Sequence, residues 1–322
     1  MAQPRLLRLL LLIVLVAVLP VCAQGPTIVA DVRAAIGRGD IAAAEALVEK
    51  FRAEVGDTPE ALEASSWLGR GALAAGDYAK AARFAERTEK LALGALKSRA
   101  LDLEPHLPTA LGAAIETQAK AMVATGQRAS AILLLQDQLK RYRSTSIRGR
   151  LQKNINLLSL EGKPAPAFTA TEFLGAPMPN MKGHPTLLFF WAHWCSDCKA
   201  QAPIVADLLK TYGPAGLVVI GPTRRYGYVA GGAAAPPDRE FTYIEQVRQQ
   251  YYSAISGMAV PLSNEDCLAY GMDATPTLAL VDRRGIVTLY HPGRMTRAEL
   301  EPYIQAIVGS AAGQGKWPKP GV

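Results

Sequence analysis

The hydrophobic pattern of the chain changes at residues 161–168, "EGKPAPAF", and this change constrains the fold more than any other feature. Between residues 28 and 160, apolar residues recur at spacings of three and four in a segment rich in Ala, Leu, Glu, Lys and Arg, which is typical of packed amphipathic helices. After the prolines, short apolar runs alternate with helical segments. The chain is therefore expected to have an all-α part followed by an α/β part.

The first 23 residues have the pattern of a secretory signal peptide. Arg5 and Arg8 precede an apolar run from Leu9 to Leu19, and small residues surround a cleavage site after Ala23. This run is shorter than the roughly 20 residues that span a membrane. We therefore expect a protein that is exported out of the cytoplasm, to the periplasm.

Cys22 leaves open a second interpretation, in which a lipidated cysteine forms the new N-terminus and anchors the protein to a membrane. Val21, directly before it, is bulkier than a lipoprotein signal tolerates well. Cleavage without lipidation is the favoured expectation.

The charge of the chain gives little indication of a partner. Removal of residues 1–23 takes away two arginines and lowers the formal net charge from +7 to +5, so the balance is mildly basic and nucleic acid is not expected as a partner. One cluster is denser and could form either a docking patch for an acidic partner or, as charge alone favours, a solvated helix face. Its members are Lys140, Arg141, Arg143, Arg148, Arg150 and Lys153.

Three stretches of the helical half can be superposed, at Gly39, Gly76 and Gly126. In each, the Gly is followed by Ala at the third and fifth positions. Glycine can end one helix in the left-handed conformation, and small alanines let the next helix lie close. The sequence therefore predicts stacked helix pairs.

The second of these stretches resembles the turn and second helix of a tetratricopeptide repeat, on the residues Gly76, Asp77, Tyr78 and Ala81, with Pro59 where a repeat would begin. The intervals of 37 and 50 residues are irregular, so the resemblance is to a degenerate repeat. It implies a concave surface for a protein or peptide ligand. A scaffold without a ligand is the alternative.

The second half contains apolar runs and helical segments in alternation, which predicts a sheet covered by helices. Strands are expected at "TLLFFWA", "GLVVIGP", "TLALVD" and "IVTLY", and helices from Cys195 to about Tyr212, from about Phe241, and after Thr296. An insertion rich in Gly, Ala and Pro occupies residues 226–237, and the last residues, 311–322, have the composition of a disordered tail.

Two cysteines three residues apart, Cys195 and Cys198, follow the first of these strands in "FFWAHWCSDCK". A closed zinc site needs four ligands, and the mature chain offers one further cysteine, Cys267, and scattered histidines. A disulfide that closes so small a loop stabilises little. A disulfide between Cys195 and Cys198 is therefore better suited to reversible formation than to stabilising the fold, and the pair is not expected to hold a metal. No cofactor is expected.

The redox interpretation has a physical basis. At the start of a helix, the Cys195 thiolate would face unpaired backbone amides and the positive end of the helix dipole, which lower its pKa and make it the attacking sulfur. Cys198, one turn further on, would resolve the mixed disulfide.

The stretch "FFWAHWCSDCK" resembles the active site of the thioredoxin superfamily, and residues 162–195 are similar to the opening of its TlpA/ResA branch of extracytoplasmic thiol-disulfide oxidoreductases. Downstream, "YGMDATPTLALVDRRG" resembles the second landmark of the family, a Thr-Pro with a cis peptide bond followed by a hairpin. The resemblance implies a thioredoxin-like fold for residues 161–310, with Trp194, Thr275 and Pro276 contacting the substrate.

The chain departs from the family pattern at three places. Phe189 stands where thioredoxins carry a buried acid, and Gln201 stands where the TlpA/ResA branch often has a Glu. Asp197, between the cysteines, disfavours the Cys195 thiolate and so favours a reducing dithiol. His193 could offset this effect when protonated, but an exposed lone histidine is more often inert.

The sequence thus predicts a signal peptide at 1–23, a tetratricopeptide-like domain at 24–160, a thioredoxin-like domain at 161–310 and a tail at 311–322. The favoured function is reduction of disulfides in partner proteins, recharged by an unidentified redox partner. The alternatives are a disulfide donor or isomerase, a binding module built on the repeats with the thioredoxin-like domain as a scaffold, and a thiol peroxidase. The peroxidase is disfavoured because its signature has a threonine three residues before the cysteine, where this chain has Ala192. Cys267 could pair with another thiol, but burial is favoured.

Overall fold

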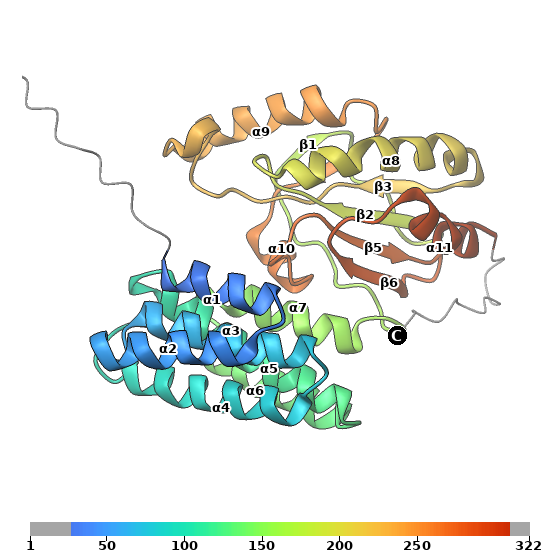
Figure 1. The fold of residues 1–322 in the computed structure, drawn as a ribbon. Coiled ribbons are helices and arrows are strands. Elements are labelled where there is room, and N and C mark those ends of the chain that lie inside the picture. Colours follow the sequence, from blue (N-terminus) through green and yellow to red (C-terminus); the bar gives the residue numbers. More distant parts are fainter. Residues whose placement is uncertain (1–26, 310–322) are drawn as a thin grey trace, which may run out of the picture.

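The computed structural model describes residues 27–309 and shows a helical half followed by an α/β half (Figure 1). The predicted signal peptide, Cys22 and the predicted tail at 311–322 lie outside the described residues. Within residues 27–309, no helix combines the length and the apolarity that a membrane span requires.

The first half is all-helical, as predicted, and its described residues form seven α-helices. The first six pack as three consecutive pairs and the seventh packs on α5 and α6. They are α1 (Ile28–Gly37), α2 (Ile41–Val55), α3 (Pro59–Ala74), α4 (Tyr78–Ala95), α5 (His106–Ala124), α6 (Arg128–Arg141) and α7 (Arg148–Ser159), with a short 3₁₀ turn, η1 (Leu101–Leu103).

Local sequence explains where these helices begin and end. The side chains of Thr27, Asp40, Thr58 and Asp77 each accept a hydrogen bond from the amide three residues on, so they cap the first four helices. The turn glycines of the three superposed stretches, including Gly39, all have positive φ. Each pair is therefore closed by a glycine in the conformation that the sequence predicted.

The alanines of the three stretches behave differently at the two positions. Those at the fifth position after the glycine, Ala44, Ala81 and Ala131, are fully buried. Those at the third position, such as Ala42 and Ala79, are exposed, so the prediction that they too permit close packing is wrong. The third position points outward because it lies in the first turn of its helix, on the face away from the neighbouring helix.

A six-stranded mixed sheet forms the second half, in the order β1-β4-β3-β2-β5-β6. The strands β2, β3 and β4 run parallel, while β1, β5 and β6 pair antiparallel to their neighbours. Their bounds are β1 (Phe173–Gly175), β2 (Thr186–Phe190), β3 (Val218–Ile220), β4 (Ala259–Pro261), β5 (Thr277–Val281) and β6 (Val287–Pro292).

Helices cover both faces of this sheet, and a separate core lies on each face. Phe189 packs toward α8, α9 and α11, while Phe190 packs toward α10 and the end of the helical half. This alternation follows from the two-residue period of a strand. The helices are α8 (Ser196–Tyr212), α9 (Pro237–Tyr252), α10 (Asn264–Ala269) and α11 (Arg297–Gly309), with the 3₁₀ turns η2 (Gly213–Ala215) and η3 (Ala230–Gly232).

Two kinds of difference separate the observed elements from the predicted ones. The short elements β1, β4 and α10 were not predicted, and α9 begins at Pro237, four residues before the predicted Phe241. Proline suits the first turn of a helix, so Pro237 starts α9 although the sequence prediction places it as the last residue of the insertion.

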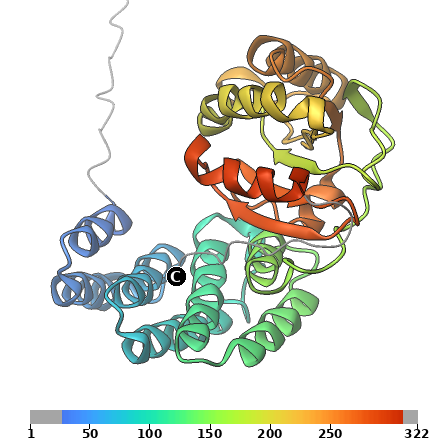
Figure 2. The same cartoon turned by 90° about the vertical axis from the view of Figure 1, so that its right-hand side faces the viewer.

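The two halves meet where α7 packs against α10 and β6, as Figures 1 and 2 show. Three members of the predicted basic cluster form ion pairs here: Arg148 with Glu265, and both Arg150 and Lys153 with Asp273. Lys140, Arg141 and Arg143 are exposed. The second half of the cluster therefore contacts acids of this same chain.

Candidate active site

The cysteine pair lies at the N-terminus of α8. Cys195 is the residue that caps this helix, and its Sγ accepts a hydrogen bond from the amide of Cys198 at 3.0 Å. The two sulfurs are joined in a disulfide, and both side chains are almost completely buried. The amide and the helix dipole both favour a negative charge on the Cys195 sulfur once the disulfide is reduced.

The cis peptide bond implied by the family resemblance is present between Thr275 and Pro276. The next residue, Thr277, pairs with Phe190 at the end of β2. Because Cys195 comes five residues after Phe190, the cis bond and the disulfide lie beyond the same end of the β2–β5 pair. Pro276 is buried and Thr275 is partly exposed.

Trp194, directly before the cysteine pair, is 48% exposed. Its ring meets the edge of Tyr226 at a centroid distance of 5.6 Å. Trp191, by contrast, is fully buried, and its indole N–H donates to the Gly221 carbonyl. Of the two tryptophans, Trp194 is thus the one that can contact a bound polypeptide.

The two positions at which the family often carries acids are neutral and buried. Phe189 is part of the core between the sheet and α8. Gln201 lies one turn after Cys198 and accepts a hydrogen bond from the Met295 amide through Oε1. Its Nε2 has no hydrogen-bond partner among residues 27–309. Neither side chain can exchange a proton with the cysteines.

Asp197, between the cysteines, has an exposed side chain in the first turn of α8. One carboxylate oxygen lies 3.7 Å from Nη1 of Arg294, which follows β6. The opposite charge of Arg294 reduces the effect of Asp197 on the Cys195 sulfur. Water reduces it further, because both side chains are exposed.

His193 is buried, which corrects the prediction that it is exposed. Its side chain is 1% exposed, and Nε2 lies 3.2 Å from Oε1 of Glu240, which is equally buried. Burial lowers the pKa of His193, while the hydrogen bond to Glu240 partly opposes this shift. The imidazole also contacts the ring edges of three tyrosines, Tyr226, Tyr228 and Tyr243.

Glu240 links the active-site loop to the insertion at residues 226–237. Besides pairing with His193, its carboxylate accepts hydrogen bonds from the amides of Tyr226 and Gly227. The sequence prediction missed this residue. A signal was present, because Glu240 occupies the first position of the buried stripe completed by Ile244 and Val247, and an acid in such a stripe needs a partner.

Cys267 is free and fully buried, as expected. It lies on α10, in the core on the face of the sheet opposite α8. Burial raises the pKa of its thiol to about 12. A thiol in this environment is protonated and inaccessible, so we do not expect it to react with a substrate disulfide.

A search of residues 27–309 for three or more His, Cys, Asp or Glu side chains able to hold one metal ion finds no such group. The buried pair His193 and Glu240 instead bond to each other and to the backbone.

Comparisons with known proteins agree with this geometry. Residues 162–225 match the AhpC/TSA family. The ResA thiol-disulfide oxidoreductase of Bacillus thuringiensis subsp. konkukian is 27% identical over 148 residues, which are 45% of this chain and 78% of that protein. The DsbE thiol:disulfide interchange protein of Xylella fastidiosa (strain Temecula1) is 24% identical over 154 residues, 47% of this chain and 70% of that protein.

Among solved structures, a thiol:disulfide interchange protein DsbE of Chlorobium tepidum covers 46% of this chain and 98% of its own, with 24% identity and a TM-score of 0.36. The second half thus has a thioredoxin-like fold, and the chain is similar in sequence to ResA and DsbE thiol-disulfide oxidoreductases. The family match lies wholly in the second half, and the sequence matches span less than half of this chain.

Proposed function

We propose that this protein is an exported enzyme that reduces disulfides of partner proteins, with Cys195 as the nucleophile and Cys198 as the resolving thiol. The observation that carries the proposal is the disulfide at the N-terminus of α8, in which the Cys198 amide donates to the Cys195 sulfur. A thiolate at this sulfur is stabilised by both the amide and the helix dipole.

The reaction has two steps. The Cys195 thiolate attacks one sulfur of the substrate disulfide, which releases the other substrate sulfur as a thiolate and forms a mixed disulfide. The Cys198 thiolate then attacks the Cys195 sulfur and releases the reduced substrate. Two electrons pass to the substrate, and the protein ends with the Cys195–Cys198 disulfide. A separate redox partner must then return two electrons.

Insulin provides the test of this activity. We expect the dithiol protein to reduce insulin disulfides, followed as turbidity in the presence of dithiothreitol. The control is protein that has been reduced and alkylated before the assay. Alkylation of Cys195, whose thiolate is stabilised at the helix N-terminus, is enough to stop the exchange, whereas Cys267 reacts slowly because burial raises the pKa of its thiol. Equal rates before and after alkylation would rule out the proposed chemistry, and turnover of hydrogen peroxide in place of insulin would favour the peroxidase alternative.

The direction of the reaction depends on the redox potential, and we expect a value nearer the roughly −270 mV of thioredoxin than the roughly −120 mV of DsbA. Asp197 opposes the Cys195 thiolate and Arg294 supports it. Asp197→Asn should therefore raise the potential and Arg294→Gln should lower it, each by less than about 30 mV because both side chains are exposed. Equilibration with glutathione measures the redox potentials of the unsubstituted protein and of the two variants.

A potential above roughly −180 mV, the value of protein disulfide isomerase, would favour a disulfide donor. If the two variants moved the potential in the same direction, Asp197 and Arg294 would not act on the sulfur as charges.

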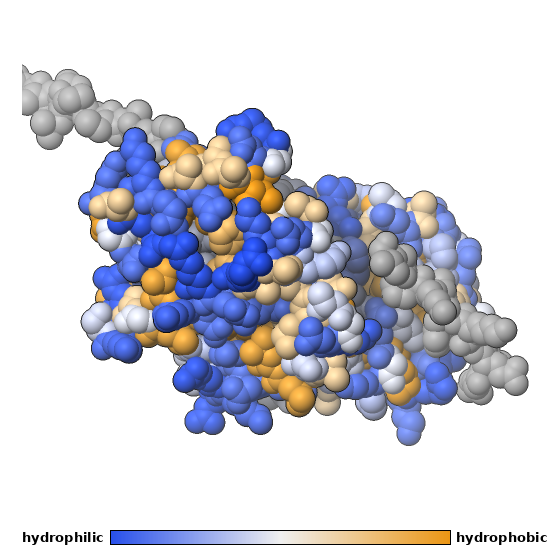
Figure 3. Space-filling model, turned by 60° about the horizontal axis from the view of Figure 1, so that its bottom comes forward, coloured by the Kyte–Doolittle hydropathy of each residue, from blue (hydrophilic) through white to orange (hydrophobic). Residues whose placement is uncertain are grey.

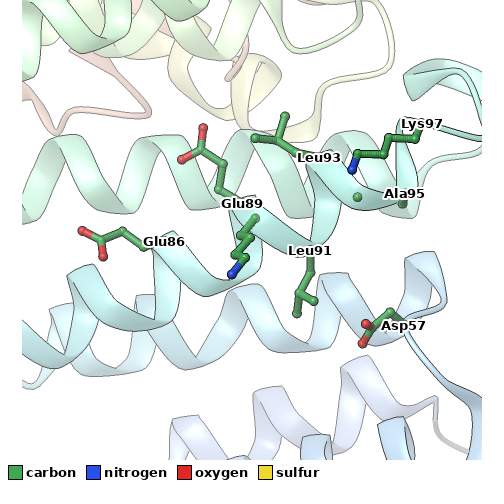
Figure 4. Close-up of a pocket in the computed structure, with 9 residues that line it drawn as sticks. Asp57, Glu86, Glu89, Leu91, Leu93, Ala95 and Lys97 are labelled. Carbon is green, nitrogen blue, oxygen red and sulfur yellow. The ribbon is translucent and has the colours of Figure 1, made fainter.

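The helical half is proposed to bind the protein whose disulfide is exchanged. Support comes from the paired helices and their resemblance to a degenerate tetratricopeptide repeat. On the face shown in Figure 3, apolar and hydrophilic side chains are interspersed. The pocket in Figure 4, along α4, includes Glu86, Glu89 and Lys97. Its charges are of both signs, so we do not assign the ligand to it.

The division of the chain at residues 24–160 and 161–310 is part of the same proposal, as is the location outside the cytoplasm, in the periplasm. The proposed location is supported by the signal-peptide pattern of residues 1–23.

A further inference from the structure

The segment that carries the cis Thr275–Pro276 bond rests on the helical half of the chain. Gly271 comes so close to α7 that an added Cβ would lie 2.4 Å from the backbone nitrogen of Lys153, and its φ is +63°. The Ala269 carbonyl accepts a hydrogen bond from the side chain of Asn156, also on α7. The backbone of residues 269–271 thus contacts α7, and this segment ends four residues before Thr275.

An ion pair continues this contact toward the cis bond. Nζ of Lys153 donates to Oδ2 of Asp273 at 3.0 Å, and Nε of Arg150 lies 3.7 Å from the same oxygen. The Lys153 side chain is 13% exposed and that of Asp273 is 26% exposed. The pair lies only two residues before Thr275.

The cations of this pair are themselves held from within the helical half. Glu116 on α5 lies 3.9 Å from Nζ of Lys153 and 3.7 Å from Nε of Arg150. Burial raises the pKa of Glu116, but Lys153, Lys120 and Arg150 outweigh that effect and hold it at about 2. The carboxylate is therefore ionised at neutral pH and keeps both α7 cations in place.

After the ion pair, the chain is fixed by short bonds. The Thr277 hydroxyl donates to the Ala274 carbonyl at 2.8 Å, and the Gly293 amide donates to the Pro276 carbonyl at 2.7 Å. Residues 274–277 are thus held to the sheet on one side, while Asp273 is held to α7 on the other. The position of Thr275 depends on both.

We propose that α7 positions the Thr275–Pro276 loop for the binding of a polypeptide substrate, and that Lys153 and Asp273 are the positioning residues. The inference rests on the proposed disulfide exchange. A polypeptide that binds along this loop needs the loop in one place, whereas a small disulfide needs only the Cys195 sulfur. The helical half would therefore affect the affinity for polypeptides through the loop, in addition to any ligand of its own.

The test uses the full chain and compares Asp273→Asn, Lys153→Met and the double variant. Each single variant should raise KM for insulin about fivefold, which corresponds to about 1 kcal/mol, and change the rate with a small aromatic disulfide less than twofold. The double variant should be close to Asp273→Asn in its KM, because that substitution already removes the contact with Lys153. Glu265→Gln is the matched control, since its pair with Arg148 lies in the same interface but ten residues before Thr275.

A second readout separates this inference from the proposed activity. Amide hydrogen exchange of residues 271–277 should be faster in Asp273→Asn and Lys153→Met than in the unsubstituted protein or in Glu265→Gln. Unchanged exchange in Asp273→Asn, or an equal rise of KM in Glu265→Gln, would overturn the inference. If the unsubstituted protein reduced neither disulfide, the proposed activity would fail, while the exchange measurement would still decide whether α7 positions the loop.

Discussion

Replacing Cys198 by serine is expected to leave the protein covalently joined to its substrates. The Cys195 thiolate can still attack a substrate disulfide, because the helix N-terminus and the amide of residue 198 remain. The thiol that would release the substrate is absent, so the mixed disulfide persists. Non-reducing electrophoresis after incubation with insulin should show roughly tenfold more adduct than the unsubstituted protein, and dithiothreitol should remove it.

The other cysteines supply the controls for this experiment. Cys195→Ser should form no adduct, since the remaining thiol of the pair lies deeper in the helix and has no exposed face. Cys267→Ser should behave like the unsubstituted protein, because this buried thiol has a pKa raised to about 12. Adducts that formed in Cys195→Ser but not in Cys198→Ser would reverse the two roles.

Much of the α/β half could be predicted because its signals are local. The strand β2 lies buried in the middle of the sheet, and such strands are continuously apolar in sequence. The turn between β5 and β6 is encoded by Asp282, whose carboxylate accepts hydrogen bonds from the amides of Arg284 and Ile286. A short polar side chain that bonds its own turn can be recognised without any knowledge of the rest of the fold.

The elements that were missed depend on partners far away in the sequence. The strands β1 and β4 have three residues each, and they form a ladder between segments more than 80 residues apart. The helix α10 has six residues and is fixed by Asp266, which accepts hydrogen bonds from the amides of Thr169 and Ala170. Periodicity over so few residues has no predictive value, since the tertiary contacts decide their conformation.

The candidate site divides in the same way. The spacing of Cys195 and Cys198 and the Thr-Pro dipeptide predicted the centre of the proposed site, because each is a signal in a short stretch of local sequence. The pairing of His193 with Glu240 spans 47 residues and could not be predicted from either residue alone. The contact of Asp273 with α7 likewise joins residues 120 apart. The partners of Glu240 and Asp273 were therefore visible only in the structure.

Removal of the Glu240 carboxylate is expected to destabilise the thioredoxin-like domain strongly. Glu240→Ala leaves His193 and the amides of Tyr226 and Gly227 without their acceptor in a buried site. Leaving a buried hydrogen-bond donor without its acceptor typically costs about 1–3 kcal/mol of the free energy of unfolding, and here several donors lose the same acceptor. Denaturant unfolding followed by tryptophan fluorescence measures this loss. On the same helix, Glu245→Ala breaks only a partly exposed pair with Arg248 and should cost less than about 1 kcal/mol.

The pH dependence gives this prediction a second, signed readout. Burial holds the pKa of His193 below its ordinary value, so the folded protein keeps the imidazole neutral where the unfolded chain has begun to take up a proton. The contribution of His193 is therefore complete above the unfolded pKa of about 6.5 and is lost as the pH falls toward the lower folded value. Without Glu240, whose hydrogen bond raises this pKa, the folded value falls further. The stability of Glu240→Ala should then drop more steeply than that of Glu245→Ala between pH 7 and pH 5. Equal slopes, or equal stabilities of the two variants at pH 7, would show that Glu240 does not hold His193 and the insertion together.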